Sequence, residues 1–188
     1  MKHVNRRGDT YYAFEGVTKT GKPKYFASKK SSSDAARRMT AMPQEFEFYE
    51  NPTNGTVVIR WIKESDILPS ELELLSDLVV RHCDCQCRVV IEDNSLVVYS
   101  AASPSPGLQS LMGMFGRSVA ELSQHAHYSP ELKFELVDHE RRTFSSSRYC
   151  HRSFMEGWMH QGRKTGSLSE LATKLLPHLG KESFFELY

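Results

Sequence analysis

The chain has 188 residues, of which 39% are hydrophobic and 25% are charged, a composition typical of globular proteins that excludes an intrinsically disordered chain. The formal net charge is only +1, but it is unevenly distributed. Residues 1–63 carry twelve Lys and Arg against six Asp and Glu, whereas residues 64–188 carry 12 against 17. This asymmetry indicates either an anionic partner for the basic part or attraction between the two parts.

The sequence shows no signal for a membrane. No apolar run approaches the roughly 20 residues that a membrane-spanning helix needs, and Met1–Arg7 lacks the apolar stretch of a signal peptide. We therefore expect a cytoplasmic protein without membrane contact. A reducing compartment keeps cysteines as thiols or metal ligands, and this applies to Cys83, Cys85, Cys87 and Cys150.

Residues 1–63 predict a basic antiparallel β-hairpin module. Four short segments have the composition of strands and are expected to pair as two hairpins: Tyr11–Val17, Lys24–Ser28, Glu45–Tyr49 and Thr56–Trp61. Gly21 and Pro23 supply the turn of the first hairpin, and Asn54-Gly55 that of the second. The polar segment Ser31–Met42 between the hairpins is expected to form one or two helical turns.

Residues 64–188 predict an α+β domain in which antiparallel strands are covered by two or three helices. The expected helices begin near Pro69, Leu108 and Ser167. The expected strands are Cys87–Ile91, Leu96–Tyr99, Leu132–Val137, Thr143–Tyr149 and a segment around Gly157–Met159. A linker is expected near residues 101–107, which are rich in Ala, Ser and Pro. The apolar C-terminus, Ser183–Tyr188, is expected to dock on the core as a strand or clamp.

Local signals define these helices more closely. Ser70–Glu73 and Ser167–Glu170 both have the pattern of a capping box, in which a serine and a glutamate satisfy the first backbone N–H groups. The amphipathic segment Leu108–Leu122 contains glycines that are expected to interrupt or kink it. The expected buried stripes are Leu68, Leu72, Leu75 and Val79 in the first helix, and Leu168, Leu171, Ala172, Leu175 and Leu176 in the last.

Two stretches resemble the ends of a bacterial family of uncharacterised proteins. The N-terminal stretch comprises Tyr11-Tyr12, Glu15-Gly16 and Thr18–Phe26, with the later Tyr49–Pro52, and the C-terminal stretch is Pro177–Leu187. The resemblance covers residues 9–61 and most of 128–188. It implies no activity, cofactor or catalytic residue.

Three thiols and an imidazole lie close together in sequence and are candidate zinc ligands: His82, Cys83, Cys85 and Cys87. In an extended strand the thiols would share one face, with successive residues ~6.6 Å apart and the outer two ~13 Å apart. Two thiolates on one zinc ion lie at most ~4.6 Å apart. We therefore predict that the cysteines pack in the core of a sheet and that no cofactor is bound, with zinc binding or redox chemistry as the alternatives.

The first hairpin combines cations with aromatic rings, as single-stranded nucleic-acid binders do. The candidate nucleic-acid-binding residues are Tyr12, Lys19, Lys22, Lys24, Tyr25, Lys29 and Lys30. Aromatic residues that form the core of a small sheet, with lysines protecting its edges, would produce the same pattern.

Residues 139–160 are rich in histidine and arginine, and this density suits a phosphate-bearing ligand. The candidate ligand-binding residues are Arg141, Arg148, His151 and Arg152. No phosphate-binding loop, nucleophile elbow or dinucleotide fingerprint is present in the sequence. We therefore favour a non-enzymatic binding or adaptor protein that recognises protein or nucleic acid. The alternatives are an enzyme or ligand-binding protein that uses residues 139–160, and a zinc-binding protein.

Overall fold

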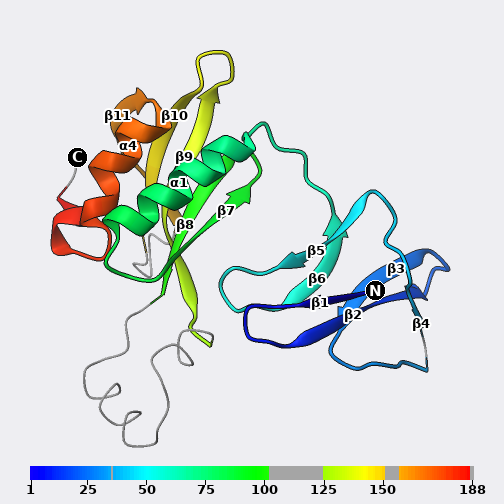
Figure 1. Ribbon diagram of the computed structural model, residues 1–188. Coiled ribbons are helices and arrows are strands. Elements are labelled where there is room, and N and C mark those ends of the chain that lie inside the picture. Colours follow the sequence, from blue (N-terminus) through cyan, green and yellow to red (C-terminus); the bar gives the residue numbers. More distant parts are fainter. Residues whose placement is uncertain (35, 102–124, 151–156, 187–188) are drawn as a thin grey trace, which may run out of the picture. The chain divides into compact units, whose positions relative to one another are not determined.

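The computed structural model describes residues 1–34, 36–101, 125–150 and 157–186 and divides the chain into two compact units, Met1–Lys63 (unit 1) and Glu64–Tyr188 (unit 2) (Figure 1). Both units contain antiparallel sheets and unit 2 adds helices, so the predicted α+β class is confirmed. The expected linker at 102–107 and the expected helix over Leu108–Leu122 lie outside the described residues. None of the described helices is both long and apolar enough to cross a membrane.

Unit 1 consists of a four-stranded sheet and a two-stranded hairpin. Its strands are β1 (Lys2–Val4), β2 (Thr10–Val17), β3 (Pro23–Ser28), β4 (Arg37–Arg38), β5 (Phe46–Glu50) and β6 (Val57–Trp61). Strand β2 lies between β1 and β3 and also pairs with β4, while β5 and β6 form the hairpin. Tyr25 contacts Phe46 edge to face at 4.8 Å, and His3 stacks on Phe48 at 5.4 Å, so the hairpin packs against one face of the sheet.

The prediction of helical turns in Ser31–Met42 is wrong for the described residues of that segment. Arg37 and Arg38 instead form strand β4, and the N–H of Met39 donates to the carbonyl oxygen of Ala13 at 2.9 Å. Beyond the short strand β1, the edge of β2 offers free backbone N–H and C=O groups. The backbone groups of Arg37 and Arg38 pair with this edge, so they do not need the hydrogen bonds of a helix.

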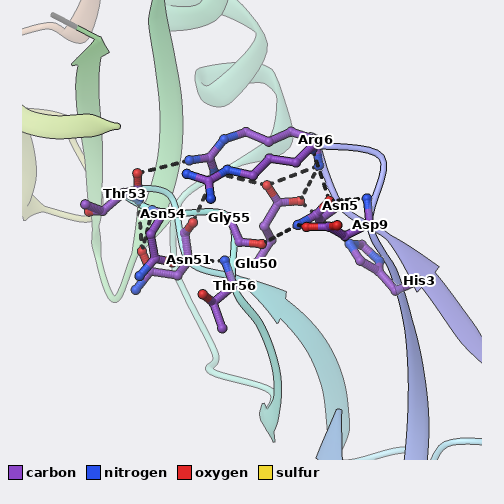
Figure 2. Close-up of polar contacts among 11 residues, drawn as sticks. His3, Asn5, Arg6, Asp9, Glu50, Asn51, Thr53, Asn54, Gly55 and Thr56 are labelled. Carbon is purple, nitrogen blue, oxygen red and sulfur yellow. Dashed lines mark hydrogen bonds and ion pairs between the residues drawn. The ribbon is translucent and has the colours of Figure 1, made fainter. Parts of the chain in front are cut away.

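A polar network joins the loop after β1 to the turn between β5 and β6 (Figure 2). Arg6 lies at its centre, and its Nη1 donates to Glu50 Oε1 at 3.0 Å and to the carbonyl oxygen of Asn51 at 3.1 Å. Its Nη2 donates to the carbonyl oxygen of Thr53 at 3.0 Å. The side chains of Arg6 and Glu50 are only 9% and 19% exposed, so this ion pair is largely removed from water.

Asn5 and Gly55 form the second half of this network. Asn5 Nδ2 donates to the carbonyl oxygen of Gly55 at 2.6 Å, while its Oδ1 accepts the backbone N–H groups of Arg7 at 3.0 Å and Asp9 at 2.8 Å. Gly55 has a φ of +70°, and a Cβ atom there would lie 3.4 Å from the guanidinium of Arg6. The positive φ is what favours glycine at this position, since a Cβ there would meet the arginine only at an ordinary van der Waals distance.

Unit 2 is a five-stranded antiparallel meander with helices on one face (Figure 1). Its strands are β7 (Cys87–Glu92), β8 (Ser95–Ala101), β9 (Tyr128–Asp138), β10 (Thr143–Cys150) and β11 (Gly157–Gly166). Its helices are α1 (Pro69–His82), α4 (Leu168–Leu175) and the 3₁₀ turns η1 (Leu176–His178) and η2 (Glu182–Phe185). The core between helices and sheet includes Leu75, Val79, Leu96, Val98, Leu132, Phe134, Phe144, Leu171, Leu175 and Phe184.

Helix α1 begins at Pro69, as predicted, but its capping residue differs from the predicted one. Pro69 is its first residue and Leu68 is the N-cap, so Ser70 is not the capping residue. The carboxylate of Glu71 still closes the helix end, because it accepts the N–H of Leu68 at 2.9 Å. Leu68 is 47% exposed and does not belong to the buried stripe, whereas Leu75 is buried as predicted. The fixed φ of proline suits the first helical position, and this preference outweighs the serine signal.

Helix α4 confirms its predicted start and its buried stripe. Ser167 Oγ accepts the N–H of Glu170 at 3.3 Å, and Glu170 Oε2 accepts the N–H of Ser167 at 3.2 Å. The α-helical part ends at Leu175, and the turn η1 with Pro177 follows. All five predicted stripe residues are buried: Leu168, Leu171, Ala172, Leu175 and Leu176.

Replacing Ser167 with alanine is expected to lower the free energy of unfolding of unit 2 by about 1 kcal/mol, because one N-terminal N–H of α4 loses its acceptor. Urea unfolding measures this change. Ser169→Ala is the matched control, since Ser169 is an exposed residue of the same helix that does not cap it. Equal stability of the two variants would contradict the capping role.

The C-terminal segment docks on the core, but as the 3₁₀ turn η2 and not as a strand. Phe184 is 2% exposed and joins the core beneath α1 and α4. The turn is closed by local bonds, because the N–H of Phe184 donates to the carbonyl oxygen of Lys181 at 3.0 Å. The buried ring of Phe184 thus anchors this segment on the core.

Candidate functional site

The register of the four-stranded sheet in unit 1 separates its side chains onto two faces. Directly paired residues of antiparallel strands share a face. Tyr12 pairs with Lys2 and Ser28, Phe14 pairs with Phe26 and Arg38, and Gly16 pairs with Lys24. These residues form what we call the cationic face, which is turned away from the β5–β6 hairpin: Lys2, Tyr12, Phe14, Lys24, Phe26, Ser28 and Arg38.

The cationic face combines exposed positive charge with aromatic rings. The guanidinium of Arg38 lies over the ring of Tyr12 at 4.2 Å from its centroid, and Lys24 Nζ lies 5.9 Å from the centroid of the Phe26 ring. Lys24 and Arg38 are exposed, while Tyr12 and Phe26 are partly buried. Within the described strands β1 to β4, no Asp or Glu occupies this face.

The opposite face of the same sheet has a different character. Arg37 pairs with Glu15, and the two side chains form an ion pair at 2.7 Å. Tyr25 lies on this inner face, where it contacts Phe46. Strand β4 therefore directs two consecutive arginines to opposite faces, one beside a carboxylate and one beside an aromatic ring.

The structure thus groups only some of the predicted nucleic-acid-binding residues. Tyr12 and Lys24 share the cationic face, while Tyr25 lies on the other side of the sheet. Lys29 forms an ion pair with Asp9 at 2.7 Å, which lowers the pKa of Asp9 and raises that of Lys29 through their hydrogen bond. The remaining predicted lysines are exposed, in the β2–β3 turn and after β3: Lys19, Lys22 and Lys30.

The cationic face also contains five residues outside the set predicted from the sequence: Lys2, Phe14, Phe26, Ser28 and Arg38. Alternation along β3 would have identified Phe26, because it lies two residues after Lys24 and therefore on the same face. Arg38 joins the face through the pairing of β4 with β2, which leaves no local signal in the sequence.

The candidate phosphate-binding residues are not assembled by the described part of the chain. Arg141 is exposed in the turn between β9 and β10, where its N–H donates to Asp138 Oδ1 at 2.9 Å. Arg148 lies near the far end of β10. Along this strand it is roughly 16 Å from Thr143, the residue at which β10 leaves the turn that contains Arg141. His151 and Arg152 lie outside the described residues.

The cysteine cluster differs from the prediction, which assumed an extended strand throughout. Helix α1 ends at His82, Cys83 is its C-cap, and strand β7 begins only at Cys87. A bend at Asp84 and Cys85 therefore brings Cys85 Sγ to 3.4 Å from Cys87 Sγ. The predicted core packing of the thiols is nevertheless confirmed, because the helix-covered core is contacted by Cys83, Cys85 and Cys87, together with Val89 and Ile91.

The bend does not create an evident metal site. Among the residues that the structure describes, no group of three or more His, Cys, Asp or Glu side chains is placed to hold a metal ion. His82 is the last residue of α1, and Cys83 Sγ lies 3.7 Å from the carbonyl oxygen of Leu176. The geometry thus brings sulfur atoms together without assembling a recognised set of ligands.

Comparison with known proteins found no family model, no curated protein and no solved structure that matches this chain. The resemblance of the terminal stretches to an uncharacterised bacterial family stays a prediction.

Proposed function

We propose that the protein is a binding protein and that unit 1 binds single-stranded nucleic acid along the cationic face. The observation that carries this proposal is the arrangement of Arg38 over Tyr12 and Lys24 near Phe26 on a sheet face without carboxylates. Exposed cations attract phosphates, and aromatic and guanidinium planes stack on unpaired bases. The excess of twelve Lys and Arg over six Asp and Glu in residues 1–63 adds a favourable long-range field.

A sheet face suits a single strand better than a duplex in this case. Three cations on the face, Lys2, Lys24 and Arg38, lie beside the partly accessible rings of Tyr12 and Phe26, whereas the ring of Phe14 is only 1% exposed. A duplex hides its bases, so it would meet only the cations, whereas an unpaired strand would also contact the rings. We further propose a cytoplasmic location, with which the free thiols of all four cysteines agree.

Binding of a labelled oligonucleotide of about 16 nucleotides to the full-length protein, measured by fluorescence anisotropy, tests the proposal. Three phosphate contacts predict a slope of about −2 in log affinity against log salt, so affinity should fall roughly 16-fold between about 50 and 200 mM salt. A duplex of the same sequence should bind more weakly at equal salt. No binding at about 50 mM salt would overturn the proposal.

Arg38→Ala and Arg37→Ala form a matched pair, because they remove the same charge from adjacent residues on opposite faces of the sheet. Arg38→Ala is expected to weaken binding about tenfold and to reduce the salt slope by about 0.7, since a stacking group and a phosphate contact are lost. Arg37→Ala should change affinity little. Equal loss in the two variants would show that net charge alone attracts the strand and would contradict the assignment to this face.

A further inference from the structure

Three thiols meet where helix α1 passes into strand β7. Cys83 has extended backbone angles at the C-cap, with its N–H donating to the carbonyl oxygen of Val79 at 2.9 Å. The chain then bends through Cys85 and enters β7 at Cys87. Successive cysteines of an extended strand would lie ~6.6 Å apart. The bend therefore brings the sulfur atoms of Cys85 and Cys87 into contact.

The contact between Cys85 and Cys87 is close, and both residues pack against the core of unit 2. Their sulfur atoms lie 3.4 Å apart, and both residues are only partly buried. Cys83 is held differently, because its thiol is directed to the carbonyl oxygen of Leu176 at 3.7 Å in the turn η1. A disulfide requires sulfur atoms about 2.05 Å apart, so the two side chains would have to move closer than their 3.4 Å contact to form the bond.

We propose that Cys85 and Cys87 form a redox-active dithiol that reduces disulfides by thiol–disulfide exchange, with Cys85 as the attacking residue and Cys87 as the resolving one.

The exchange has two steps. The Cys85 thiolate attacks one sulfur of the substrate disulfide, so that a Cys85–substrate S–S bond forms, the substrate S–S bond breaks and one substrate thiolate leaves. The Cys87 thiol then loses its proton to solvent and its sulfur attacks Cys85, which forms the Cys85–Cys87 disulfide and releases the second substrate thiolate. Two electrons pass from the dithiol to the substrate disulfide, which is reduced to two thiols.

The electrostatics agree with this order of attack. A hydrogen bond from the Cys87 thiol is the main cause that lowers the pKa of Cys85 to about 7, although burial and the carboxylates of Glu131 and Asp84 oppose it. Hydrogen bonds to Cys83 and Cys85 raise the pKa of Cys87, which favours its protonated thiol form. The hydrogen bond with Cys87 also lowers the pKa of Cys83, assisted weakly by Lys181.

Reaction of the reduced full-length protein with the aromatic disulfide DTNB tests the proposal. The wild-type chain should release both aromatic thiolates for each Cys85–Cys87 pair and retain no adduct there, whereas Cys87→Ala should release one and keep a mixed disulfide on Cys85. The rate of the first step should rise as the pH passes about 7, because the thiolate is the nucleophile, and this rise should shift to higher pH in Cys87→Ala.

Mass spectrometry identifies the bridge, because trypsin releases all three thiols in the single peptide His82–Arg88. After blocking of free thiols, fragmentation should show a blocked Cys83 and a Cys85–Cys87 bridge. Cys150→Ala is the control and should leave both the stoichiometry and the bridge in this peptide unchanged.

Three outcomes would overturn the proposal. The first is a stable mixed disulfide on Cys85 in the wild-type chain, and the second is a bridge that includes Cys83. The third is stoichiometric zinc in the purified protein that is released when the thiols are modified, because this would make the cluster a metal site.

Discussion

Replacing Arg6 with alanine is expected to lower the free energy of unfolding of unit 1 by about 3–5 kcal/mol. The side chain is 9% exposed and donates to Glu50 and to the carbonyl oxygens of Asn51 and Thr53 (Figure 2). Its removal leaves a carboxylate that is only 19% exposed and two carbonyl groups without this partner. The loss is large because the desolvated acceptors cannot all regain water while the fold persists.

Hydrogen exchange measured by mass spectrometry at increasing urea concentrations tests this prediction, because it reports unit 1 and unit 2 separately. Arg6→Ala should lower the transition of unit 1 and leave that of unit 2 unchanged. Arg37→Ala is the matched control, since its ion pair with Glu15 involves a side chain that is 84% exposed and should contribute little. An unchanged unit 1 transition in Arg6→Ala would contradict the stabilising role of the network.

Replacing Phe184 with alanine is expected to lower the free energy of unfolding of unit 2 by about 3–5 kcal/mol. The ring is 2% exposed and packs with the core residues of α1, α4 and the sheet, so its loss removes apolar contacts and leaves a cavity. The ring also anchors the short turn η2 of the C-terminal segment on the core.

The same exchange experiment measures this change and locates it. Peptides from η1 and α1 should exchange faster in Phe184→Ala, whereas peptides of unit 1 should not respond. Glu186→Ala is the control, because Glu186 is exposed and lies two residues further along the same segment. Equal stability of the two variants would show that the C-terminal segment does not contribute to the core.

Local signals predicted the parts of the fold that depend on neighbouring residues. The capping box at Ser167 predicted the start of α4, and Asn54-Gly55 predicted the turn between β5 and β6, in which Gly55 adopts a φ of +70°. Strand β4 was not predicted, because two consecutive arginines have no strand pattern and the pairing with β2 is not local. In strand β4 the tertiary pairing with β2 therefore outweighs the local sequence preference.

The cysteine prediction failed at one specific step. Alternation from Cys83 to Ile91 favoured a single strand, but helix α1 continues to His82 and β7 begins only at Cys87. No glycine or proline marks the end of this helix, so the sequence lacks the usual stop signal. The cationic face was predicted in part, because alternation along β2 and β3 separates Tyr12 from Tyr25 but does not reveal Arg38.

The brevity of strand β4 has a consequence for the evolution of this surface. Both of its residues are arginines, and they differ only in the face of the sheet on which their side chains lie. A shift of one residue in the pairing with β2 would therefore move Arg38 to the inner face and Arg37 to the cationic face. Insertions or deletions between β3 and β4 are therefore tolerable only where they preserve this alignment. The loop after β3 determines, through its length, which guanidinium reaches the ring of Tyr12.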